Sequence, residues 1–438
     1  MISSRVRTGL TAVWAALHTT QYGMAITGLN GISDAMTCSV DSKQIGIHSV
    51  SAGWLKPCVY MTSAQFGLIV SIFTLGGLAG CLLSDLVTRS HGRIGTLRTS
   101  AATILLGSLA VAIANSVPSM IFGRVLVGVG CGLATVTVPL FLAEIAPPSI
   151  KRSLGIMNQL FIVFGMLIAQ SLSFLWAKPM SWRYVLAVSI VVAVSQLVGS
   201  LFVRPTDPEK DQSRGGDEED RLIPRETVKP LTIRQLITST DSKIRRGLVV
   251  VAVTQLAQQS CGVSPVMYFS TRILKPVFGG NSKLIAILIV IFKVPLTAVP
   301  ALLIERVGSR PILLFSATVM SASAFVLAFG LNASSGPACV AAILSFVAAF
   351  SIGLGPVTWV VLSEVMPHEA TTAAGAIGIG LNWTTNFVMG STFLPLQQWL
   401  SGSTESGEGN IFYVICGICA LLFLTLKASY AAYDRVAI

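Results

Sequence analysis

Twelve apolar stretches, each long enough to cross a lipid bilayer, follow one another along most of this 438-residue chain. A membrane-spanning helix needs about 20 mostly apolar residues, because the bilayer offers no water to satisfy exposed backbone groups. Hydrophobic residues make up 53% of the chain and charged residues only 11%, a balance that excludes an ordinary soluble domain. We therefore expect an all-α membrane protein. The predicted spans are Thr8–Ile32, Ser63–Val87, Thr96–Ala114, Pro118–Ile145, Ser153–Ala177, Arg183–Val203, Gly247–Arg272, Lys283–Ile304, Pro311–Leu331, Pro337–Val365, Thr371–Leu396 and Ile411–Ala432.

The two halves of the chain repeat one charged hairpin. Leu142–Ile145 (LAEI) in the first half recurs as Leu362–Val365 (LSEV) in the second, and Pro147 after the first matches Pro367 after the second. Two similar halves, each a group of spans, are typical of transporters built from internal repeats. We expect two pseudo-symmetric six-helix bundles, residues 1–203 and 247–438, joined by a cytosolic linker over 204–246.

Two local patterns add detail to this outline. Gly128 and Gly132 in the fourth span have the spacing that lets another helix approach closely. In the linker, Pro230–Thr240 is expected to form a short surface helix.

The basic residues predict how the chain is oriented. The net charge is +11, but the bases lie between the apolar stretches and form no patch with exposed aromatic residues, so we expect no nucleic-acid partner. An even number of spans places both termini on one side. That side carries 21 of the 30 Lys and Arg residues, and the other carries 7. Because cytosolic loops are rich in Lys and Arg, we expect both termini in the cytosol. We also expect a multi-pass protein of the plasma or vacuolar membrane that acts as a monomer.

No arrangement of residues indicates an enzyme. Four histidines are scattered without metal-ligand spacing, and no Gly-rich phosphate-binding loop is present. We expect no cofactor and no metal site. Any transport would then be passive or driven by a solute or ion gradient.

Two of the cysteines lie outside the spans. Cys38 and Cys58 are in the first loop opposite the termini, on the side that is oxidising if it faces the exterior or the secretory lumen. The sequence is compatible with a disulfide between Cys38 and Cys58 and with two free thiols. Cys416 and Cys419 form a CxxC pattern within an apolar helix, where packing is a far commoner role than metal or redox chemistry.

Polar side chains inside a span are costly and therefore mark candidate binding residues. Gln258 and Gln259 lie in the seventh span beside Gly262 and Pro265, which are expected to break the helix. Their amides both donate and accept hydrogen bonds, which suits a hydroxyl-rich solute. The alternative is that they only join neighbouring helices.

Further polar and aromatic residues line other spans. Gln159 and Gln170 share one face of the fifth span, and Asn382 and Asn386 share one face of the eleventh. Trp359 follows the Gly-Leu-Gly-Pro break of the tenth span. It could stack on a sugar ring or pack against lipid.

Lys293 lies about ten residues from each end of the eighth span, too deep for its charge to reach water easily. It needs a partner or a cavity. An interior ion pair or carbonyl contact is one interpretation. The other is contact with an anionic group of the solute or with a titrating step.

Charged residues cluster where spans end on the side of the termini. We expect salt bridges between helices that close this face in one state and separate in the other. Plain surface charges are the alternative, worth little to stability. The candidate gating residues are Arg93, Glu144, Arg152, Glu305, Arg306, Arg310 and Glu364.

Several of these motifs together resemble the sugar porter family of the major facilitator superfamily. They are Gln255–Tyr268 (QLAQQSCGVSPVMY), Glu305–Arg310 (ERVGSR), Gly123–Arg124 and Asn382–Thr384, with a weaker similarity to a fungal, vacuole-associated branch. The resemblance implies the major facilitator fold and alternating access by two rocking bundles. It also implies that Gln159, Gln258, Gln259 and Trp359 hold hexose hydroxyls. We expect Ser264, Tyr268, Lys293 and Asn382 to belong to the same site.

The sequence also departs from the family pattern. The binding asparagines of the seventh and eighth spans are replaced by Ser264 and Lys293, and the glutamate of the tenth span by Ser351. The aspartate that serves proton-coupled members is matched by Ala25. The prediction is a carrier of a hexose or related polyol, facilitative or proton-coupled. The alternatives are a carrier of another, acidic solute and a membrane solute sensor or trafficking factor that does not transport.

Overall fold

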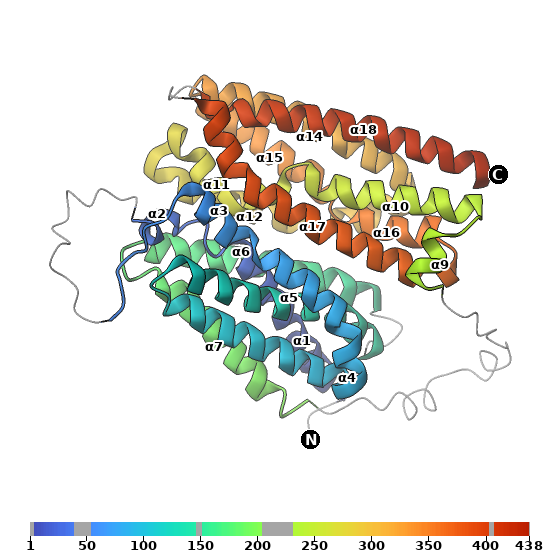
Figure 1. Ribbon diagram of the computed structural model, residues 1–438, viewed down its shortest axis with the longest axis horizontal. Coiled ribbons are helices and arrows are strands. Elements are labelled where there is room, and N and C mark those ends of the chain that lie inside the picture. Colours follow the sequence, from blue (N-terminus) through green and yellow to red (C-terminus); the bar gives the residue numbers. More distant parts are fainter. Residues whose placement is uncertain (1–3, 39–53, 146–150, 204–230, 403–406, 438) are drawn as a thin grey trace.

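The computed structural model describes residues 4–38, 54–145, 151–203, 231–402 and 407–437 (Figure 1). These ranges are predominantly helical and contain no β-strand. The helices before residue 204 are α1 (Ser4–Thr27), α2 (Ser33–Met36), α3 (Ser63–Ser71), α4 (Phe73–Ala112), α5 (Val117–Ile145), α6 (Lys151–Trp176) and α7 (Arg183–Gly199). After residue 230 follow α9 (Ile233–Ile237), α10 (Ser242–Ser260), α11 (Val263–Phe278), α12 (Ser282–Leu296), α13 (Val299–Val307), α14 (Ser309–Asn332), α15 (Gly336–Ile352), α16 (Val357–Val365), α17 (His368–Ser401) and α18 (Asn410–Ala437).

Every predicted span corresponds to one or more of these helices. Within the described residues, seven helical segments are long and apolar enough to cross a membrane, judged by length and composition alone. Two of them, Ser63–Ala112 and Ser242–Leu296, each hold more than one predicted span. The helices α1, α7 and α17, which account for three further spans, are shorter or more polar. The all-α membrane architecture predicted from the sequence is confirmed.

Several spans are interrupted, and the interruptions have local causes. Gly262, between α10 and α11, has a φ of 89°, a left-handed conformation that suits glycine. Pro265 then lies in the first turn of α11, where its missing N–H leaves no hydrogen bond unmade. The predicted break of the tenth span is also present, because α15 ends at Ile352 and α16 begins at Val357.

Glycines let α4 and α5 pack almost backbone to backbone. A Cβ atom added at Gly128 would lie 1.9 Å from the carbonyl oxygen of Phe73, and one at Gly132 would lie 2.1 Å from that of Gly77. Only glycine fits such contacts, so the close approach predicted for this glycine pair is confirmed.

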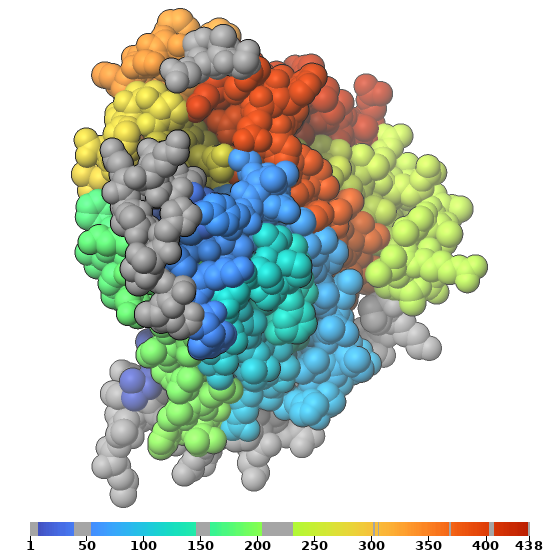
Figure 2. Space-filling model, turned by 60° about the vertical axis from the view of Figure 1, so that its left-hand side comes forward, coloured from blue at the N-terminus to red at the C-terminus, as the bar shows by residue number. Residues whose placement is uncertain are grey.

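The helices pack as two sets, the N-terminal set (α1–α7) and the C-terminal set (α9–α18). The sets meet where α17 lies against α3 and α4, and where α12 lies against α6. Figure 1 shows α2 and α3 at one end of the molecule and α9 at the other, and Figure 2 shows the blue segment around α3 directly against the orange-red α17. We call the end with α2 and Cys38 the disulfide end, and the end with α9 the terminal end.

The short helix predicted between the halves is α9. Thr232 caps it through its side chain and Leu236 is fully buried, so the helix is anchored rather than free. The backbone N–H of Leu231 also donates to the carbonyl oxygen of Glu369 at the start of α17 (2.9 Å). Residues 204–230 of the expected linker lie outside the described residues, and the bundle boundaries stay a prediction.

Candidate solute-binding site

A network of buried amides joins α10 to α17. The side-chain Nδ2 of Asn382 donates to Oε1 of Gln255 (2.9 Å) and to Oε1 of Gln258 (2.5 Å). Nε2 of Gln259 donates to Oδ1 of Asn382 (3.1 Å), and the hydroxyl of Ser264 donates to Oε1 of Gln259 (2.6 Å). We call these five residues the amide network.

The local sequence explains why the network forms. Gln255, Gln258 and Gln259 are three and four positions apart, so they share one face of α10. The break at Gly262 then turns the chain so that Ser264 reaches back to Gln259. Gln255 was missed in the sequence analysis as a site residue, although its spacing from Gln258 was a visible signal.

Gln258 also joins the network to the broken span. Its Nε2 donates a hydrogen bond to the carbonyl oxygen of Gly355, in the turn between α15 and α16. A helix break frees backbone carbonyls that a continuous helix would use internally. The amide of Gln258 therefore connects the last turn of α10 to the break between α15 and α16.

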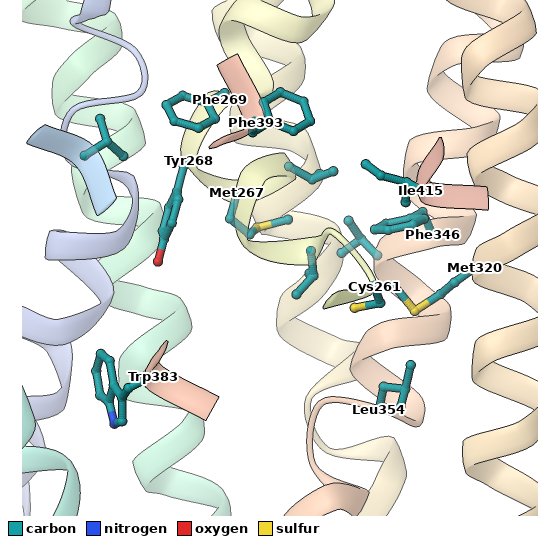
Figure 3. Packing of buried hydrophobic residues seen from close by; sticks show 14 of the residues in the cluster. Cys261, Met267, Tyr268, Phe269, Met320, Phe346, Leu354, Trp383, Phe393 and Ile415 are labelled. Carbon is teal, nitrogen blue, oxygen red and sulfur yellow. The ribbon is translucent and has the colours of Figure 1, made fainter. Parts of the chain in front are cut away.

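Aromatic residues border the network on the side of the N-terminal set. The hydroxyl of Tyr268 donates to Oδ1 of Asn386 (2.8 Å). The ring of Trp383 lies 5.7 Å from that of Tyr22 on α1 and against Gly77 on α4. Figure 3 shows Tyr268 and Trp383 on the same side of the buried cluster, away from Phe346 and Ile415.

Two predicted site residues lie apart from the network. Gln159 is exposed on α6, and Trp359 on α16 is 43% exposed. Among the described residues, neither shares a hydrogen bond with the amide network. The structure thus places Gln258, Gln259, Ser264 and Asn382 together, with Tyr268 nearby through Asn386 on α17, and leaves Gln159 and Trp359 separate.

Lys293 is buried on α12, with 6% of its surface exposed. Its Nζ lies 5.7 Å from the centre of the Phe350 ring on α15, a cation–π distance. The structure describes no carboxylate within salt-bridge distance of this ammonium. The interior ion pair considered from the sequence is therefore absent from the described part of the chain.

Arg124 is a second buried cation, and sequence reasoning did not single it out as a site residue. Its guanidinium donates to the carbonyl oxygens of Ala25 (3.0 Å), Ile69 (3.1 Å) and Val70 (2.9 Å), and it lies 4.5 Å from the Phe73 ring centre. These carbonyls are near the end of α1 and the break between α3 and α4. Its position inside an apolar span was the available signal.

The predicted gating residues pair within each set. Nε of Arg93 donates to Oε1 of Glu144 (3.1 Å), joining α4 to α5. In the C-terminal set, Glu364 accepts from the hydroxyl of Ser309 (2.5 Å), and Arg310 pairs with Asp434. Asp434 was not predicted as a partner.

The remaining gating candidates form no such pair in the described structure. Arg306 is exposed at the terminal end. The side chains of Arg152 and Glu305 lie outside the described part of the structure.

Contacts between the two sets gather at the disulfide end. Asn30 on the N-terminal set donates to the hydroxyl of Ser270 (2.7 Å) and accepts from the backbone N–H of Thr271 (3.1 Å). Lys275 and Asp34 form an ion pair between the sets with an N–O distance of 2.6 Å. The hydrogen bonds of Asn30 and the Lys275–Asp34 ion pair thus join the two sets at this end.

The same end carries the disulfide and a vestibule. Cys38 and Cys58 form a disulfide that ties α2 to the segment before α3. The vestibule has a volume of about 1020 Å³, and Ser63, Arg272 and Gln398 are among its lining residues. The Ser63 hydroxyl accepts hydrogen bonds from Arg272 (2.7 Å) and Gln398 (2.8 Å), which adds a further bridge between the sets.

Two sets of membrane-spanning helices, with a buried polar network inside the second, are typical of a membrane transporter of the major facilitator fold. The structure is similar to the inward-open conformation of the xylose transporter XylE from E. coli, with a TM-score of 0.75 and 20% identity over 96% of this chain and 95% of that one. At this identity the similarity establishes the fold alone.

The family model described as "Sugar (and other) transporter" matches residues 11–428, and the chain belongs to this family. A probable metabolite transport protein of Saccharomyces cerevisiae is 30% identical, over 98% of this chain and 92% of the relative. The human solute carrier family 2, facilitated glucose transporter member 4 is 29% identical, over 86% and 80%.

Proposed function

We propose that this protein carries a sugar, a hexose or a related polyol, across a membrane by alternating access. The observation that carries the proposal is the amide network, which gathers the donors and acceptors of Gln258, Gln259 and Asn382 at a helix break inside the bundle. Each amide offers both a donor and an acceptor, so a hydroxyl that enters the site can replace an internal hydrogen bond. The family membership supports the same substrate class.

Alternating access is supported by where the two sets touch. Cross-contacts such as Asn30 with Ser270 hold the disulfide end closed, whereas Arg93 with Glu144 joins helices of one set only. We infer that residues 1–203 and 247–438 move as two bundles about the linker 204–246. With both termini in the cytosol, as the distribution of Lys and Arg favours, the end that these contacts hold closed faces away from the cytosol. We also propose a monomer without a nucleic-acid partner.

The surroundings of Arg124 favour passive transport. Its guanidinium is satisfied by backbone carbonyls, including that of Ala25, so no carboxylate is needed beside it. A carboxylate at this point would offer a proton-binding group in the membrane interior. With alanine there, coupling to protons would need another group.

Uptake of labelled hexoses into proteoliposomes, with and without a pH gradient, tests the proposal. Saturable uptake without a gradient is the expected result. Uptake that depends on the gradient would support a sugar carrier but overturn the proposal that transport is passive. Binding without uptake by folded protein would replace the carrier with a solute sensor.

A further inference from the structure

We propose that Lys293 binds a carboxylate carried by the solute, so that among sugars the carrier binds a sugar acid more tightly than the neutral hexose of the same stereochemistry. This inference rests on the proposed function, because it specifies the solute of the same carrier. It starts from a buried ammonium for which the described residues provide no counter-ion.

The two buried cations of the spans differ in how they are satisfied. Arg124 donates to three carbonyl oxygens and lies against the Phe73 ring. Lys293 is buried to a similar extent, yet the described structure gives its ammonium no hydrogen bond and no ion pair, and the Phe350 ring centre lies 5.7 Å from it. Removing a charge from water without a hydrogen-bonded partner is costly, so such a residue indicates a function by default.

Among the residues that the structure describes, no acidic side chain lies in the middle of a span, where Lys293 is. The acidic side chains that the structure describes lie at or near the ends of the spans or in the connecting segments: Asp34, Asp85, Glu144, Asp241, Glu364, Glu369, Glu408 and Asp434. Within the described chain, the membrane interior is therefore positively charged. A solute with one negative charge would compensate the ammonium of Lys293 on binding.

Lys293 is close to the amide network through one shared neighbour. The Phe350 ring under the ammonium also lies against Gly355, where an added Cβ would be 2.9 Å from Cε1 of that ring. The carbonyl oxygen of Gly355 accepts the hydrogen bond of Gln258. The hydroxyl of Ser351, next to Phe350, is buried and has no hydrogen-bond partner in the described structure. The ammonium and the amide network thus both border the segment Phe350–Gly355, which also carries the Ser351 hydroxyl.

Lys293 also lies at the seam between the sets. Val290 on α12 packs against Ile162 and Met166 on α6. The two helices run in opposite directions. Lys293 comes three residues after Val290 on α12, and Gln159 comes three residues before Ile162 on α6. Each step of three residues leads about 4.5 Å toward the terminal end. Gln159, which the amide network leaves out, is therefore at the level of Lys293 on the facing helix. A solute between them would contact both sets.

Binding of matched ligand pairs to the purified protein tests this assignment. We would titrate glucose, galactose and mannose, and the uronic acid of each, at pH 7, with glucose 6-phosphate as a further anion. The parent protein is expected to bind at least one uronate about 10-fold more tightly than the hexose of the same stereochemistry. Lys293→Gln should bring that ratio near one, whereas Lys293→Arg should keep it. Lys283→Gln, at the disulfide end of the same helix, is the matched control and should also keep it.

The outcomes separate this inference from the proposed function. Hexoses that bind as tightly as their uronates would overturn the sugar-acid assignment and leave the sugar carrier standing. A preference that survives in Lys293→Gln would remove Lys293 from the site. Tighter binding of glucose 6-phosphate than of any uronate would overturn the assignment of a carboxylate as the anionic group of the solute. Folded protein that binds none of the ligands would overturn both proposals.

Discussion

At the scale of single residues, Arg124 shows how a charge can be structural inside a membrane protein. Its planar guanidinium reaches carbonyls from α1 and from the break between α3 and α4 at the same time. Helix ends leave such carbonyls without a partner, so one side chain stabilises both irregular points. A lysine has the charge but not the fork of donors.

We therefore expect Arg124→Lys to destabilise the protein by about 1–3 kcal/mol, because buried carbonyls lose their donors. Thermal unfolding in detergent measures this as a lower midpoint. Arg89→Lys is the control, since Arg89 pairs with Asp85 at the surface and both side chains are mostly exposed. Equal midpoints for the two variants would mean that the carbonyl contacts of Arg124 contribute little.

Gln258 is the residue on which the proposed solute site depends most. Gln258→Ala should weaken sugar binding by about 1–3 kcal/mol, because the solute and Asn382 each lose a buried partner. Equilibrium binding to purified protein measures the change. Gln196→Ala is the control: it removes a buried amide on α7 that has no hydrogen-bond partner in the described structure. Unchanged affinity in folded Gln258→Ala would exclude Gln258 from the site.

Residue types and spacing predicted part of this site and could not predict the rest. Glutamines at helical spacing in an apolar span indicate one polar face, and Gln258 and Gln259 do share it. Asn382 was also expected at this site, but its hydrogen bonds to Gln255 and Gln258 depend on how α17 packs, which no local pattern encodes. The same holds for Glu364, whose partner is Ser309 rather than one of the predicted arginines.

At the scale of elements, glycine positions determine which helices can touch. The spacing of Gly128 and Gly132 predicted a close contact, and the structure shows that α4 is the partner. The helix breaks could also be predicted, because Gly262 and the Gly-Leu-Gly-Pro segment interrupt otherwise apolar stretches. The direction in which each broken helix continues could not be predicted from the sequence, since it depends on the neighbouring helices.

Replacing glycine by alanine should have opposite effects at two sites. Gly128→Ala should lower stability by about 1–3 kcal/mol, because the new methyl group would lie 1.9 Å from the Phe73 carbonyl oxygen. Gly417→Ala on α18 should raise it by about 0.4–1 kcal/mol, since nothing lies within 4 Å and alanine favours the helix. Thermal unfolding of both variants checks the contrast. A stabilising Gly128→Ala would show that α4 and α5 can separate at little cost.

At the scale of the whole molecule, the described state depends on contacts at one end. Asn30 makes the most buried of these, with Ser270 and the backbone of Thr271. Asn30→Ala would leave their polar groups unpaired and weaken closure by about 1–3 kcal/mol. The population open at the disulfide end should then rise about 5- to 150-fold, at about 1.4 kcal/mol for each factor of ten.

A cysteine at Ser71 can report this opening. Ser71 is fully buried. A Cβ added at Gly390 on α17 would lie 2.8 Å from the Cβ of Ser71, so the Ser71 side chain faces the C-terminal set. In the Ser71→Cys background, Asn30→Ala should increase the rate of labelling by a hydrophilic maleimide. Asn115→Ala is the matched control, because Asn115 binds the backbone of Trp54 and Lys56 within the N-terminal set at the same end. An equal rate in both variants would mean that apolar packing between α3 and α17, rather than Asn30, keeps this end closed.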